Sequence, residues 1–98
     1  MLTDKDYCDY KLVLELKELG YDYIRREGLI HLYDAQKWLR EEFGINIFVM
    51  QITIEGSGMH RYASYIQLGD KIWLCRYYSL YEEALSEGIK EAVKILKK

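Results

Sequence analysis

Residues 59–78 read MHRYASYIQLGDKIWLCRYY, and this stretch decides the fold. Two runs rich in β-branched and aromatic residues, each typical of a strand, flank the dipeptide Gly69-Asp70. A two-residue loop with glycine in first place is typical of a type II′ hairpin turn. We therefore expect strands over residues 59–68 and 71–78, joined by a tight antiparallel turn.

The turn also predicts which side chains share a face, because successive residues of a strand point to opposite sides of the sheet. With Leu68 opposite Lys71, one face carries the pairs Ile66 with Trp73, Ser64 with Cys75, and Tyr62 with Tyr77. The other face carries Arg61, Ala63, Tyr65, Ile72, Leu74 and Arg76. Neither face is purely polar. Either both faces are partly covered, or one presents aromatic side chains to a partner.

A third strand is expected upstream of these two, over residues 45–54, and a flexible turn at Gly56-Ser57-Gly58 follows it. The first half of this strand is apolar on both faces, with alternating side chains from Ile45, Ile47, Phe48, Val49 and Met50. An apolar run of this kind is typical of a strand that is buried on both sides. We therefore expect a central strand.

Two helices are expected before the strands. The first begins near Thr3, Asp4 and Asp6, which favour a helix N-terminus, and it ends at Gly20. Its apolar stripe consists of Cys8, Leu12, Leu16 and Leu19. The second helix ends at Gly44, and its apolar face consists of Ala35, Trp38, Leu39 and Phe43. Residues 21–31, between the two helices, are expected to form a small hairpin or an ordered loop.

The C-terminal helix has the strongest local signal in the chain. Ser79 and Glu82 match the S-x-x-E capping box, and an apolar face follows with Leu85, Ile89, Ala92 and Leu96. Gly88 costs about 1 kcal/mol relative to alanine inside a helix, so we expect the helix backbone to pack closely on the sheet there. The order predicts an α+β fold with an α-β-β-β-α core: two N-terminal helices, a three-stranded antiparallel meander and a C-terminal helix packed on one face.

Length and composition exclude several classes of protein. We expect the 98 residues to form a single domain, 1–98, because an independent core usually needs about 100 to 150 residues. No proline interrupts the chain, and a formal charge of −2 differs from the strongly basic character of duplex-binding domains. No apolar run is long enough to span a membrane, and the acidic N-terminus does not resemble a signal peptide. We expect a cytoplasmic protein that does not bind membranes.

The residue types that carry metal or nucleophilic chemistry do not stand at diagnostic spacings. His31, His60, Cys8 and Cys75 match neither C-x-x-C nor H-E-x-x-H, so no metal site and no cofactor are expected. Free buried thiols are favoured over a Cys8–Cys75 disulfide in a reducing compartment. Cys75 with His31 or His60 is the one nucleophile-base pair to consider, and its alternation with Trp73 and Tyr77 is more typical of a core residue.

Ten tyrosines are the one compositional excess. We expect a noncatalytic protein whose aromatic surface contacts an unknown protein partner or a second copy of the chain; the candidate surface residues are Tyr62, Tyr65, Trp73, Arg76 and Tyr77. The alternative is a protein that stacks single-stranded nucleic acid on an aromatic sheet face, although the net acidity and the lack of an RNP-like motif count against it. A small enzyme with a Cys/His site ranks third.

Two separated segments carry a resemblance to a known group. Residues 32–41 read LYDAQKWLRE, and residues 78–89 read YSLYEEALSEGI. The chain resembles a group of small uncharacterised proteins of Bacteroides-type gut bacteria and their prophages, which share a YEAQKWLRE helix and a terminal SYEEALEAGI helix. Asp34 replaces the usual glutamate, and His31 stands where the group tends to have a threonine cap. The resemblance implies a single-domain α+β protein carried on mobile elements, and it implies no activity.

Overall fold

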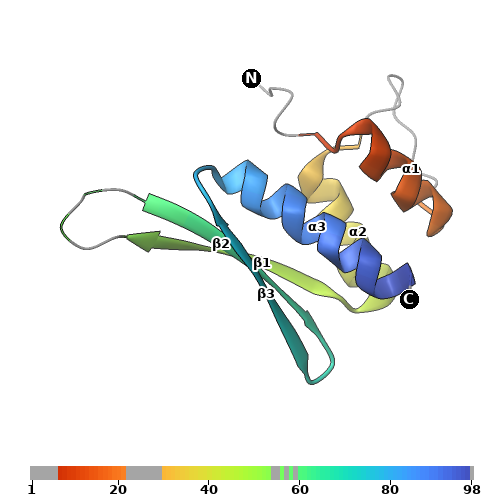
Figure 1. Ribbon diagram of the computed structural model, residues 1–98. Helices are drawn as coiled ribbons and strands as arrows, with labels where there is room; N and C mark the ends of the chain where they lie inside the picture. Colours follow the sequence, from red (N-terminus) through yellow and green to blue (C-terminus); the bar gives the residue numbers. More distant parts are fainter. Residues whose placement is uncertain (1–6, 22–29, 54–55, 57, 59, 98) are drawn as a thin grey trace.

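The computed structural model describes residues 7–21, 30–53, 56, 58 and 60–97. Within these ranges it contains three helices and three strands (Figure 1). In chain order they are α1 (Tyr10–Glu18), α2 (Leu32–Phe43), β1 (Asn46–Thr53), β2 (His60–Leu68), β3 (Lys71–Tyr78) and α3 (Tyr81–Lys97).

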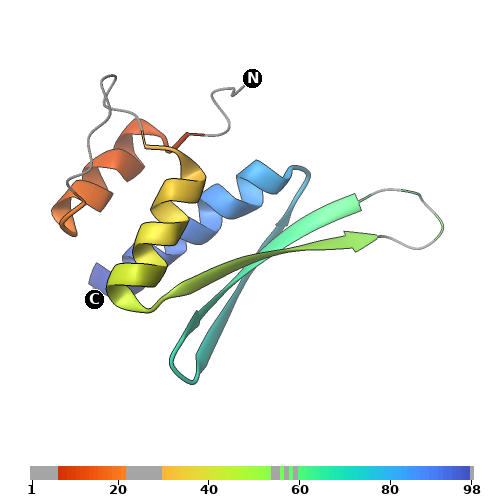
Figure 2. The ribbon, with the colours of Figure 1, turned by 180° about the vertical axis from the view of Figure 1, so that it is seen from behind.

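The strands form an antiparallel meander in the order β1-β2-β3, and α3 packs across one face of it. Seen from behind, α2 lies beside α3 on the same side of the sheet (Figure 2). No described helix lies on the opposite side. The result is a flat molecule, with extents of 46 × 37 × 19 Å, and the α+β fold expected from the sequence is confirmed.

The core lies between the helices and the covered face of the sheet. Its largest fully buried side chains include Leu12, Leu16, Leu39, Ile45, Ile66, Leu85, Ile89 and Val93. Each such side chain contributes roughly 1.5 to 3 kcal/mol on removal from water, which makes this layer the main source of stability.

Gly88 marks a close approach of α3 to the sheet, as its position in an otherwise good helix sequence predicts. A Cβ atom built on Gly88 would lie 2.8 Å from Ile47 Cγ2 and 3.1 Å from Ser64 Cβ. Distances below 3.0 Å force a neighbour to move. The glycine therefore allows the helix backbone to rest directly on β1 and β2.

The first helix begins later than expected. Asp9 caps α1, and its side chain accepts a hydrogen bond of 2.8 Å from the backbone N–H of Leu12. Tyr7 forms a β-bridge with His31, and the Cys8 N–H donates to the carbonyl of Ile30, so residues 7 and 8 are extended. The expected cap residues 3–6 lie outside the described residues. The extended pairing with residues 30–31 prevents the helix from starting before Asp9.

Most of the segment expected as a hairpin or loop, residues 22–29, also lies outside the described residues. The residues on either side of it, Tyr21 and Ile30, are buried in the core.

The second helix, α2, agrees with its prediction. His31 Nδ1 accepts a hydrogen bond of 3.2 Å from the Tyr33 N–H, and Gly44 closes the helix in the left-handed conformation (φ 69°). A histidine thus fills the N-cap position that serine or threonine usually occupies.

Two further expectations, on the start of α3 and on the place of β1 in the sheet, were wrong. The backbone N–H of Ala84 donates to the carbonyl of Leu80, so α3 begins one residue later than the capping box predicts. Ser79 Oγ instead accepts a hydrogen bond of 3.1 Å from Arg61 Nη1. The segment expected as a central strand, β1, lies at an edge of the sheet. Ser57, in the expected turn after β1, lies outside the described residues.

Candidate interaction surface

A β-bulge in β3 decides which side chains share a face. Leu68 pairs with Lys71 and Ile66 with Trp73, as the turn predicts. Between Ala63 and Tyr65 the register shifts, so that Cys75 and Arg76 oppose the single residue Ser64.

The bulge moves the end of β3 by one residue relative to the expected register. Tyr77 pairs with Ala63, and Tyr78 pairs with Tyr62. The expected pairs Ser64 with Cys75 and Tyr62 with Tyr77 were therefore wrong, because a two-residue turn fixes the register only up to the first irregularity. Tyr77 consequently lies on the face opposite to the one expected.

The uncovered face of the sheet can be assigned from the contacts of Gly88. Ile47 and Ser64 lie against α3, so their neighbours in the strands point to the other side. We call this other side the bare face; its apolar members are Phe48, Met50, Ile52, Ala63, Tyr65, Ile72, Leu74 and Tyr77. No described helix packs against it.

The bare face exposes large apolar side chains on its two outer strands, β1 and β3, and a half-buried tyrosine, Tyr65, lies between them on β2. Leu74 is 68% exposed, Ile72 65% and Tyr77 60%, and both Phe48 and Met50 are 40% exposed. Their cross-strand neighbours bring them together, since Phe48, Tyr65 and Leu74 form one row and Met50, Ala63 and Tyr77 form the next. These rows make a continuous apolar surface.

Two aromatic rings on this surface are held against each other. Phe48 and Tyr65 are directly opposite on β1 and β2, and their rings stack with centroids 4.9 Å apart and an interplanar angle of 23°. Cross-strand aromatic pairs stabilise a sheet by roughly 0.2 to 1 kcal/mol. The stack occupies the inner face of each ring.

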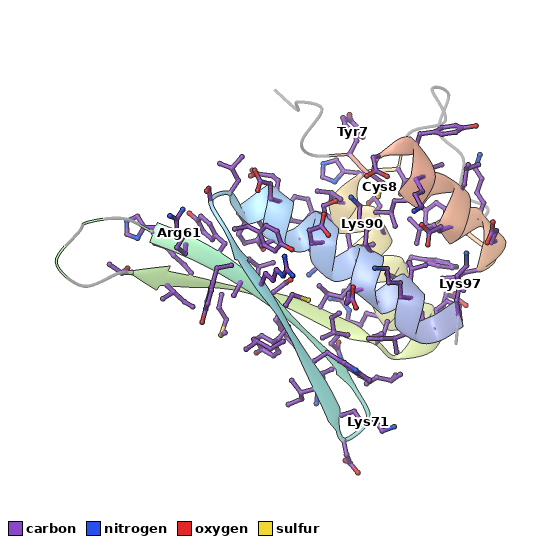
Figure 3. The ribbon with its side chains drawn as sticks, in the orientation of Figure 1. Tyr7, Cys8, Arg61, Lys71, Lys90 and Lys97 are labelled. Atoms are coloured by element: carbon purple, nitrogen blue, oxygen red, sulfur yellow. The ribbon has the colours of Figure 1, made fainter. Side chains whose placement is uncertain are left out.

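Charge is nearly absent from the bare face. The three strands contain Arg61, Lys71 and Arg76 and no acidic residue. Arg61 is the only described charged residue whose position in the pairing pattern lies on this face, and its guanidinium already donates to Ser79. In Figure 3, Arg61 and Lys71 lie at opposite ends of the sheet. The apolar centre is therefore flanked by sparse positive charge.

The five residues expected as an interaction surface do not lie together. Tyr65 and Tyr77 are on the bare face, whereas Tyr62 packs edge-on against Tyr81 of α3, with ring centroids 6.0 Å apart. Trp73 packs against the core on the covered side. Arg76 is exposed at the bulge.

Sequence reasoning missed four of the exposed apolar residues as surface candidates: Phe48, Met50, Ile72 and Leu74. The signal for the first two was present. Residues 45–50 are apolar on both faces although the strand lies at an edge, which means that one apolar face has no covering layer within the described structure.

A cleft of about 460 Å³ lies between β3 and α3. Its walls include Cys75, Arg76 and Tyr78 from the strand, and Glu87, Glu91 and Lys94 from the helix. Burial, followed by the charge of Glu87, raises the pKa of Tyr78. The cleft therefore combines both signs of charge around a half-buried thiol.

The histidines expected as partners of Cys75 lie elsewhere. His60 Nδ1 is 3.0 Å from Gln51 Nε2 and 3.2 Å from Thr53 Oγ1, at the far end of β1 and β2. His31 caps α2 and packs edge-on against Tyr7. Neither histidine lines the cleft that contains Cys75. The geometry does not bring a thiol and an imidazole together at that cleft.

The other cysteine is embedded in the helical layer. Cys8 is buried and carries a free thiol, and burial together with the neighbouring Asp9 carboxylate raises its pKa to about 12. A thiol with so high a pKa is protonated at neutral pH and is a poor nucleophile. The expectation of free thiols agrees with the structure, except that Cys75 is half-buried rather than buried.

Two ion pairs fix α1 to α3. Asp9 Oδ2 lies 2.8 Å from Lys90 Nζ at one end, and Glu18 pairs with Lys97 at the other (Figure 3). The hydrogen bond from Lys90, followed by the Leu12 N–H, lowers the pKa of Asp9, and the same bond to Asp9 raises the pKa of Lys90. These charges serve the packing of the helical layer.

Comparisons with other proteins leave the site to be interpreted from its geometry. No known protein family, no curated protein and no solved structure matches the chain. Within the described ranges, no three His, Cys, Asp or Glu side chains are grouped as metal ligands would be. No helix among the described residues has the length and apolar character needed to cross a bilayer.

Proposed function

We propose that the protein is a noncatalytic interaction domain that binds a protein partner through the bare face. The observation that carries the proposal is the set of five large apolar side chains that stand 40–68% exposed on the two outer strands of the bare face. Contiguous exposed apolar patches larger than a few hundred Å² are rare on monomeric proteins and mark interaction surfaces.

The chemistry of the bare face favours a protein partner. Met50, Ile72 and Leu74 are not aromatic, so they offer no π-face on which a base could stack. The rings of Phe48 and Tyr65 stack on each other, so Tyr77 is the one strongly exposed ring among the described residues of this face. Depletion of charge at the centre of the patch is typical of the core of a protein–protein interface.

The remaining parts of the structure support a noncatalytic role. The cleft beside Cys75 is lined by neither histidine, and the high pKa of Cys8 keeps its thiol protonated. We include cytoplasmic residence in the proposal, because a reducing compartment keeps both thiols in the free state in which they stand here.

A single-stranded nucleic-acid partner is the second candidate, and one observation favours it: the strands carry three cationic residues and no acidic residue. Binding of that kind depends strongly on salt. Titration of a labelled single-stranded oligonucleotide at low ionic strength, followed by fluorescence anisotropy, separates the two candidates. We expect no salt-dependent saturation; its presence, and its loss in Arg76→Ala, would replace the proposal by this alternative.

The proposal itself is tested by affinity capture with three baits: the wild type, Leu74→Lys and Leu14→Lys. Both leucines are exposed, at 68% and 42%, but Leu74 is on the bare face and Leu14 is on α1. We expect a protein that is captured by the wild type and Leu14→Lys and is lost with Leu74→Lys. The lysate contains the untagged chain as well, so that a second copy can be captured. Capture that is equal for all three baits, or absent for all three, would contradict the proposal.

A further inference from the structure

We infer that the partner of the bare face is a second copy of this chain, and that two copies pack face to face as a two-fold symmetric dimer. The inference rests on the proposed function and specifies the occupant of its surface. Four properties of the described residues lead to it: the area of the face, its lack of charge, the protection of the sheet edges, and the thickness of the molecule.

The area of the bare face agrees with what a stable dimer requires. Because large side chains have accessible areas of about 150 to 250 Å², the exposed fractions of Phe48, Met50, Ile72, Leu74 and Tyr77 amount to roughly 500 Å² of largely apolar surface. A standard interface buries about 800 Å² per partner, of which about 65% is apolar in homodimers. The apolar part of such an interface is therefore already present.

Lack of charge makes the face complementary to itself. A two-fold interface brings the same patch of both subunits together, so any unpaired charge on the patch would oppose its own kind. The bare face keeps this cost small, because its one described charge, Arg61, lies at one end of the sheet and donates a hydrogen bond to Ser79. A partner recognised by charge would find few groups to pair with here.

The edges of the sheet are less suited to self-association than its face. Gln36 Nε2 donates a hydrogen bond of 2.7 Å to the carbonyl of Ile47, which occupies a backbone acceptor of the edge strand β1. The bulge at Cys75 and Arg76 interrupts the other edge, β3. Both features are devices by which proteins prevent edge-to-edge pairing.

The thickness of the molecule leaves room for a further layer on the bare face. The smallest extent of 19 Å accommodates a helical layer and one sheet. Two sheets that pack face to face lie about 10 Å apart, with side chains interdigitating between them. Pairing two copies in this way gives four layers, with helices outside and a β-sandwich inside.

The dimer is tested by sedimentation equilibrium of the full chain from about 1 μM to about 100 μM, a range that covers moderate and weak self-association. We expect the wild type to approach twice the chain mass. Leu74→Lys and Ile72→Lys place a charge at positions that are 68% and 65% exposed, so the monomer remains folded, which circular dichroism verifies. We expect each to weaken the dimer by at least about 30-fold, as loss of an interface hot spot does.

Leu14→Lys is the matched control, because it makes the same substitution at an exposed leucine on α1, and it should dimerise as the wild type does. A wild type that stays monomeric throughout the range would overturn the inference, as would a dimer that persists in both Leu74→Lys and Ile72→Lys. The capture experiment then distinguishes a failure of the proposed function from a failure of the inferred dimer. If the wild type is monomeric but capture still depends on Leu74, the proposed function stands and only the identity of the partner is wrong.

Discussion

The covered and bare faces of the sheet use the same three strands and differ in what lies against them. On the covered face, Ile47 and Ile66 are 4% and 0% exposed beneath α3. On the bare face, Phe48 is 40% exposed and Leu74 68%. Both faces are apolar, so the hydrophobic pattern of the strands predicts a sheet with an apolar surface on each side. On the covered side, Gly88 lets the backbone of α3 lie close to the sheet.

Matched truncation of two isoleucines should give the greatest difference between the faces. Ile66→Ala leaves a cavity beneath α3 and should lower the free energy of unfolding by about 2 to 5 kcal/mol. Ile72→Ala removes a side chain that is 65% exposed and should cost the monomer less than about 1 kcal/mol. Urea denaturation of dilute protein measures both. Equal losses of unfolding free energy in the two variants would mean that Ile72 is packed against other residues in the folded monomer.

Gly88→Ala tests the close approach of the helix to the covered face. Overpacking against Ile47 should cost about 1 to 3 kcal/mol, and the better helix propensity of alanine returns about 1 kcal/mol, which leaves a net loss of about 1 kcal/mol. Ser86→Ala, at a half-buried position of α3, changes propensity without the clash and serves as the control. If Gly88→Ala were as stable as this control, α3 would not rest on the sheet as described.

Asp9→Ala tests the attachment of α1 to the helix that covers the sheet. Loss of the N-cap should cost about 1 kcal/mol at pH 7, and the half-exposed ion pair with Lys90 should add less than about 1 kcal/mol.

The same variant should reveal a pH dependence. Because the folded pKa of Asp9 is lowered, its contribution is fully present above the unfolded pKa of about 3.9 and is lost as the pH falls through the folded value. The stability difference between the wild type and Asp9→Ala, measured by denaturation at several pH values, should shrink in acid. A constant difference down to pH about 2, below the usual range of Asp carboxyls, would contradict the assignment of this bond.

Ser64→Ala should change the free energy of unfolding least, and the sign of that change is informative. Ser64 is fully buried on the covered face, and its Oγ has no hydrogen-bond partner among the described residues. Removal of a buried hydroxyl without a partner relieves a desolvation penalty, so the variant should be as stable as the wild type or more stable by up to about 1 kcal/mol. A loss above that amount in a thermal or urea transition would reveal a hidden partner of the hydroxyl.

The fold was predictable because its signals are local. The hairpin at Gly69-Asp70, the second helix up to Gly44 and the close packing at Gly88 each depend on a residue type with a specific backbone or steric role. Boundaries set by pairing between distant segments were not predictable. The start of α1 depends on the bridge between Tyr7 and His31, which no local pattern announces.

The interaction surface was predictable only in part, for a similar reason. The two-residue turn places Tyr65 and Leu74 on one side, but the bulge reassigns Tyr77, and a bulge leaves little trace in a single sequence. The exposed pair Phe48 and Met50 was interpreted as half of a buried strand. The hydrophobic pattern of a strand shows how much apolar surface the strand carries. It does not predict whether another layer of the protein packs against that surface.

The bulge at Cys75 and Arg76 has a consequence for how the chain can change over generations. One extra residue there turns the last two tyrosines of β3, so that Tyr77 faces outward and Tyr78 faces α3. Loss of a single codon at this point would remove the bulge and leave Tyr77 opposite Ala63 and Tyr78 opposite Tyr62, so both rings would keep their faces. The same deletion would make β3 a regular edge strand, so a minimal genetic lesion could open this edge to pairing with other chains while the bare face survives.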